Sequence, residues 1–65
     1  MTRIEEIVFE AMELGIRDNL YNRVSVLSYK PEYRYVELYR LYEDALNFEK
    51  EMLFKNILID ESRNT

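Results

Sequence analysis

Apolar residues along the chain recur every three or four positions, with charged or polar residues between them. This spacing places the apolar side chains on one face of an α-helix, and no segment alternates as a half-buried β-strand would. The single Gly and single Pro provide few turns, although an all-β domain needs several. The pattern therefore predicts an all-α fold.

A first helix is predicted over residues about 3–14. Thr2 and Glu5 have the spacing of a capping box, in which each side chain bonds the backbone N–H of the other residue. Gly15 follows at the position that favours a left-handed C-cap, and Ile16 would be its apolar partner. The apolar face of this helix comprises Ile4, Ile7, Val8, Ala11 and Leu14.

A second helix is predicted over about 19–29, with Asp18 or Asn19 as its cap. Its apolar face comprises Leu20, Val24 and Leu27, extended by Ile16. On one unbroken helix the two apolar faces would lie on nearly opposite sides, which favours a break near Gly15. The alternative is one kinked helix, because an interior Gly costs only about 1 kcal/mol. A continuous stripe also crosses this position: Phe9, Met12, Ile16, Leu20, Val24 and Leu27.

A long third helix is predicted over about 31–60. The ring of Pro31 is pre-set for the first helical position, and Lys30 before it is disfavoured in helical geometry. The polar tail, residues 61–65, is expected to fray. Thirty helical residues span about 45 Å, whereas a compact domain of this size is under roughly 30 Å across. The predicted fold is one small domain in which two short N-terminal helices, or one kinked helix, pack antiparallel on one long C-terminal helix.

The long helix carries two apolar stripes, about 115° apart. One is largely aliphatic and is predicted to form the core within the chain: Leu38, Leu41, Ala45, Phe48, Met52 and Ile59. The other is predicted to be the protein-binding surface: Tyr35, Tyr39, Tyr42, Leu46 and Leu53. Tyr combines a large ring with a polar hydroxyl and is enriched at interfaces. The leading hypothesis is a homodimer that completes a helical bundle across these tyrosines; the alternative is that they pack on their own chain's first two helices.

The composition argues against catalysis and against a metal site. No His and no Cys are present, which removes the commonest general base, the thiol nucleophile and the best transition-metal ligands. A single Gly does not provide a Gly-rich phosphate loop. We therefore predict no catalytic residues, no cofactor and no metal, and a protein that is not an enzyme.

The size of the chain limits its core. A chain of 65 residues buries only about 60% of its unfolded surface. Without disulfides or zinc, it depends on close helix packing or on self-association. No apolar segment approaches 18 residues, and the N-terminal segment is acidic where a secretory leader is basic and then apolar. We expect a cytoplasmic protein that does not associate with membranes.

The predicted function is protein–protein interaction, as a homodimeric regulator or inhibitor of another protein. The size and the lack of catalytic groups suit the accessory proteins of phages and mobile elements. A structural assembly subunit is the second candidate, and an acidic DNA mimic or nucleic-acid-associated protein is the third. Basic residues alternate with tyrosines between positions 30 and 40, but acidic residues share this region and the net charge is −4. Direct nucleic-acid binding is therefore not expected.

Overall fold

The computed structural model describes the backbone of residues 2–63 and the side chains of residues 2–56. Four helical segments follow one another in it: α1 (Arg3–Glu13), α2 (Arg17–Ser28), the 3-10 turn η1 (Pro31–Tyr33) and α3 (Leu38–Arg63). No strand occurs among these residues, and the three α-helices pack on one another. The prediction of an all-α fold is confirmed.

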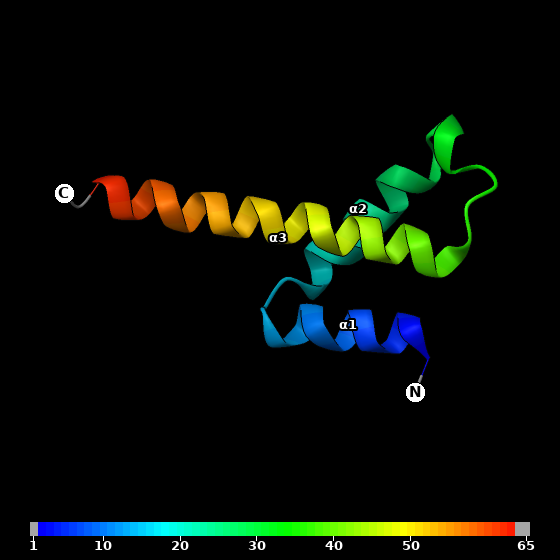
Figure 1. Cartoon of the computed structure of the whole chain (residues 1–65), viewed down its shortest axis with the longest axis horizontal. Helices are drawn as coiled ribbons and strands as arrows, with labels where there is room; N and C mark the ends of the chain where they lie inside the picture. Colours follow the sequence, from blue (N-terminus) through cyan, green and yellow to red (C-terminus); the bar gives the residue numbers. More distant parts are fainter. Residues whose placement is uncertain (1, 64–65) are drawn as a thin grey trace.

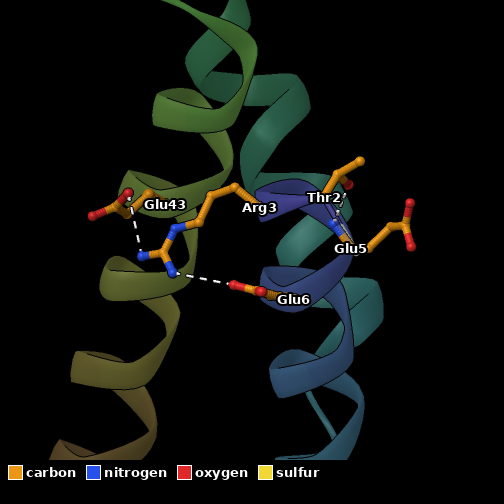
Figure 2. Close-up of polar contacts among 5 residues, drawn as sticks. All are labelled: Thr2, Arg3, Glu5, Glu6 and Glu43. Atoms are coloured by element: carbon orange, nitrogen blue, oxygen red, sulfur yellow. Dashed lines mark hydrogen bonds and ion pairs between the residues drawn. The ribbon is translucent and has the colours of Figure 1, made fainter.

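The first turn of α1 is capped by a side chain, as the sequence predicted. The Oγ1 atom of Thr2 accepts a hydrogen bond from the backbone N–H of Glu5 at 3.1 Å (Figure 2). The carboxylate of Glu5 projects away from the helix in the same view and, within the described part of the chain, returns no bond to Thr2. One half of the predicted capping box is therefore formed.

α1 ends in a left-handed turn at Gly15, whose φ angle is 72°. The N–H of Gly15 bonds the carbonyl of Met12 at 3.1 Å, and the N–H of Ile16 bonds the carbonyl of Ala11 at 2.9 Å. These two bonds define a Schellman motif, and Ile16 is buried beside it. The chain therefore breaks at Gly15, and the alternative of one kinked helix is wrong.

α2 begins at Arg17, earlier than the sequence predicted. Ile16 occupies the N-cap position without a side-chain bond, and its carbonyl accepts the N–H of Leu20 at 2.8 Å. Asp18 lies in the first turn, so the prediction that Asp18 or Asn19 caps this helix is wrong. The reason is that the turn at Gly15 leads directly into α2 through one buried apolar residue.

α3 begins at Leu38, not at Pro31 as predicted. Pro31 opens only the short turn η1, and residues 34–37 form a non-helical connection. The hydroxyl of the half-buried Tyr33 donates a hydrogen bond to Oδ2 of Asp44 at 3.0 Å. On an unbroken helix these residues would lie about 16 Å apart along the axis. The chain must therefore turn back before α3 for this bond to form.

The C-terminal end of α3 also differs from the prediction. The helix continues through residues 61–63, where fraying was predicted, while residues 64–65 lie outside the described residues. The orange and red part of α3 projects past α1 and α2 (Figure 1). The molecule measures 46 × 29 × 14 Å, and its radius of gyration of 13.5 Å exceeds the roughly 11 Å of a compact chain of this length.

α1 runs in the same direction as α3, and α2 runs back across α3 at an angle (Figure 1). The ion pairs Arg3–Glu43 and Glu10–Lys50 fix the direction of α1, because both partners advance together along the chain. The predicted antiparallel packing therefore applies to α2 and is wrong for α1. The reversal at Gly15 requires the two short helices to run in opposite directions.

The core lies where α1 and α2 meet the first half of α3. Eight buried apolar side chains form it: Ile7, Ala11, Ile16, Leu20, Leu27, Leu41, Ala45 and Leu46. Three other predicted face residues of the two short helices pack against this core: Val8, Leu14 and Val24. Ile4, which was also predicted to belong to the face of the first helix, is half-buried and lies outside this packed group. In contrast, Phe9 and Met12 of the kinked-helix stripe are exposed. The apolar faces predicted for the two separate helices are therefore confirmed, with the exception of Ile4.

Candidate interaction surfaces

The aliphatic stripe of α3 is divided between core and surface. Leu41 and Ala45 are buried, as predicted. Three other members are exposed, contrary to the prediction: Leu38 (59%), Phe48 (45%) and Met52 (48%). Phe48 lies at the outer edge of the stripe, away from the side that α1 and α2 cover. Leu38 is the first residue of α3, and Met52 follows the last buried apolar residue of this helix, Leu46. Ile59 lies outside the described side chains.

The tyrosine stripe is divided as well. Leu46 is buried, and Tyr42 and Leu53 pack against the core. Tyr35 is 92% exposed and precedes α3, whereas Tyr39 is 39% exposed. The five residues predicted to form one protein-binding surface therefore lie in different environments, because the short helices cover part of the stripe. Packing within the chain, the alternative interpretation, applies to Tyr42.

Polar contacts join the short helices and η1 to α3. The shortest distances are 3.6 Å for Arg3–Glu43, 2.7 Å for Glu10–Lys50, 3.0 Å for Arg23–Glu49 and 3.0 Å for Tyr33–Asp44. Arg3 also lies 3.6 Å from Glu6, so its guanidinium bridges two carboxylates (Figure 2). The carboxylates in these contacts are bound by other side chains of the molecule. They therefore do not form an acidic face that contacts only solvent.

Arg23 is the central polar residue between α2 and α3. Its Nε donates to Oε1 of Glu49, which is only 8% exposed. Its guanidinium carbon lies 5.7 Å from the centre of the Phe48 ring, a cation–π distance. Its Nη2 lies 3.5 Å from the sulfur of Met52. No sequence signal identified this cluster, because Arg23 and Glu49 are 26 positions apart and meet only through packing.

An exposed apolar surface, here called the Phe48 flank, overlaps this cluster, because Arg23 contacts both Phe48 and Met52. It comprises Val26 of α2 with Phe48 and Met52 of α3, and these side chains are 51%, 45% and 48% exposed. An open groove of about 330 Å³ adjoins Val26 and Met52 but not Phe48, and it is lined by Asn19, Asn22, Arg23, Val26, Glu49 and Met52. The Phe48 flank is therefore an apolar surface with a charged, ion-paired border.

A second exposed apolar surface, here called the tyrosine end, lies where the chain passes from α2 to α3. Its members are Tyr29 (86%), Tyr35 (92%), Val36 (36%), Leu38 (59%) and Tyr39 (39%). Three basic and two acidic side chains in the same segment give it a net charge of +1: Lys30, Arg34, Arg40, Glu32 and Glu37. Tyr and Arg are the residue types enriched at binding hot spots.

Tyr33 links the tyrosine end to α3 through a hydrogen bond. The hydrogen bond to Asp44 raises the pKa of the Tyr33 phenol above 10.0, because loss of the proton would remove the bond. Partial burial and the charge of Asp44 act in the same direction. The non-helical connection, residues 34–37, is therefore held in position by the Tyr33–Asp44 hydrogen bond as well as by packing against the core.

The exposed area is larger than the size of the chain requires. A compact monomer of 8.0 kDa exposes about 4,450 Å², whereas this chain exposes 5267 Å². The excess, about 800 Å², equals the area that one partner contributes to a standard protein–protein interface. The elongated shape of the molecule, 46 × 29 × 14 Å, is consistent with this larger area.

Comparisons with family models, curated proteins and solved structures found no match to this chain. Within the described residues, no three carboxylates lie together as a metal site would require. No helix in the same part of the chain is long and apolar enough to cross a membrane. The two exposed apolar surfaces are the features of the described residues that indicate a function.

Proposed function

We propose that the chain is a non-enzymatic protein-interaction module that forms a homodimer and acts as a small regulator or inhibitor of another protein. The observation that carries this proposal is the excess of about 800 Å² of exposed surface. Contiguous exposed apolar patches mark interaction sites in soluble proteins. Here they occur on two separate surfaces, so a second copy and a different partner would not compete for one site.

The tyrosine end is the surface that we assign to the different partner. Its rings offer large contact areas with few rotatable bonds, and its guanidinium groups can bind carboxylates of a partner. Its net charge of +1 contrasts with −4 for the whole chain, which favours a partner with an acidic contact surface. This role suits an accessory protein of a phage or mobile element.

Acidic mimicry of DNA finds less support in the geometry. A mimic must present a dense row of free negative charges. In this chain, carboxylates of both α1 and α3 are paired with cations within the molecule, including Glu10, Glu43 and Glu49. Protein–protein interaction through apolar surfaces is therefore the better supported function.

Sedimentation equilibrium between about 1 and 100 µM tests the homodimer. We expect a mass of 16.0 kDa, twice the 8.0 kDa of one chain. A mass of 8.0 kDa across this range would contradict the proposal. Assembly into species much larger than a dimer would favour the structural subunit instead.

A further inference from the structure

We propose that the second copy docks on the Phe48 flank, with the two α3 helices side by side and antiparallel. In this arrangement Phe48 of each chain packs beside Met52 of the other copy. The inference rests on the proposed homodimer and names its interface. The tyrosine end of each chain stays free for the different partner.

The distribution of apolar side chains on α3 favours this interface. Phe48 and Met52 are one helical turn apart, about half exposed, and form one ridge. A two-fold axis midway between them brings each ring against a thioether of the second copy, a favourable sulfur–aromatic contact. Val26 of α2, which is 51% exposed, widens the covered surface.

Charged side chains beside Phe48 and Met52 are complementary in the same arrangement. Asp44 precedes Phe48 by four residues and Lys55 follows Met52 by three, so the same axis brings Asp44 within one residue, about 1.5 Å along the helix, of Lys55 of the second copy. At about 100° per residue these two charges lie within about 20° of each other around α3, on the side of Phe48. A parallel pair would place like charges opposite each other. The antiparallel pair forms two attractive contacts between chains that each carry −4.

The tyrosine end is less suited to a second copy. Two-fold pairing across it would bring its basic side chains against the same side chains of the other chain. Lys30, Arg34 and Arg40 are all exposed there. Like charges across an interface oppose association, so the Phe48 flank is the surface that a second copy fits.

Two Phe substitutions on the same helix provide a matched test. Phe48→Ala removes the proposed contact twice per dimer, and we expect the dimer dissociation constant to rise about tenfold or more. Phe54→Ala removes an equally exposed ring, 51% against 45%, from a side of α3 about 120° away. We expect it to change the dissociation constant less than about threefold. Sedimentation equilibrium measures both, and circular dichroism checks that each variant stays helical.

Cross-linking tests the orientation independently of the Phe48 variant. The chain has no Cys, so a single introduced cysteine has no other thiol in its own chain with which to form a disulfide. We expect Asp44→Cys chains mixed with Lys55→Cys chains to form a disulfide-linked dimer under mild oxidation. Each variant alone should give little cross-linked dimer, since the antiparallel pair separates identical positions by roughly 10 Å or more.

The outcomes separate the interface from the proposed function. A wild-type dimer that Phe48→Ala and Phe54→Ala affect equally would overturn the docking site and leave the homodimer intact. Efficient cross-linking of either single-cysteine variant alone would overturn the antiparallel arrangement. A wild-type chain that stays monomeric would overturn both the homodimer and its interface, and would leave the Phe48 flank to a different protein.

Discussion

Single residues decide how the two short helices are joined, and Gly15 is the clearest case. Its φ angle of 72° lies in the left-handed region, while a Cβ added there would meet no atom within 4 Å. We therefore expect Gly15→Ala to lower the free energy of unfolding by about 1–2 kcal/mol through backbone strain alone. Gly15→Asn should lose less, because Asn tolerates this conformation. Urea denaturation followed by circular dichroism measures both changes.

A control for this prediction lies two residues earlier. Glu13 is exposed and belongs to the end of the same helix. Glu13→Ala should change the free energy of unfolding by less than about 0.5 kcal/mol. If Gly15→Ala were equally mild, the left-handed turn would not be required for the fold.

The bond between Tyr33 and Asp44 predicts a dependence on pH. The carboxylate raises the pKa of the Tyr33 phenol above its ordinary value of 10.0. The bond therefore contributes its full stabilisation below pH 10.0, and that contribution is lost as the pH rises through the raised pKa. Asp44→Ala should return the pKa towards 10.0, which NMR titration of the Tyr33 ring measures. Asp18→Ala is the control, and an unchanged pKa in Asp44→Ala would refute the assignment.

Residues differed in how well the sequence predicted their roles. The cap at Thr2 and the turn at Gly15 follow from neighbours within a few positions, so their residue types were sufficient to predict them. The bonds Tyr33–Asp44 and Arg23–Glu49 join positions 11 and 26 apart. Their formation depends on where α3 begins and how α2 crosses it, and neither is encoded in local spacing.

At the scale of helices, the sequence predicted which sides of α3 are apolar but not which of them face the core. The helical wheel gives two apolar stripes, and a neighbouring helix can cover either stripe or the space between them. In the structure, the short helices cover the space between the stripes. Ala45 of one stripe and Leu46 of the other are therefore both buried. Of the predicted contact residues, Leu46 therefore became part of the core and Tyr42 and Leu53 pack against it, while Phe48 became exposed.

The contact between α2 and α3 gives a prediction at the same scale. Arg23→Met leaves the carboxylate of Glu49, 8% exposed, without its partner. We expect a loss of about 1–3 kcal/mol in the free energy of unfolding. The double variant Arg23→Met with Glu49→Leu should be more stable than Arg23→Met alone, because no unpaired charge remains.

Chemical denaturation of the two single variants and the double variant measures this coupling. Arg17→Met is the matched control, because Arg17 is half exposed and lies 3.9 Å from a carboxylate that is 90% exposed. It should lose less than about 1 kcal/mol. Strict additivity of the Arg23 and Glu49 substitutions would show that the ion pair does not stabilise the α2–α3 contact.

At the scale of the whole molecule, flatness and small size limit what one chain can bury. The shortest dimension is 14 Å, and the eight buried apolar side chains come from residues 7–46. Beyond that core, α3 continues without a neighbouring helix (Figure 1). A chain with this much exposed surface gains stability if a second copy covers part of it.

The final prediction follows from that coupling between folding and association. If folded chains pair and unfolded chains do not, each tenfold rise in concentration stabilises the dimer by about 1.4 kcal/mol, or roughly 0.7 kcal/mol per chain. For a chain of this length the melting temperature should then rise by about 3–5 °C per tenfold increase. Thermal unfolding at about 2, 20 and 200 µM measures this slope. A melting temperature independent of concentration would show that the single chain carries all of its own stability, because mass action permits no such result for a dimer that dissociates as it unfolds.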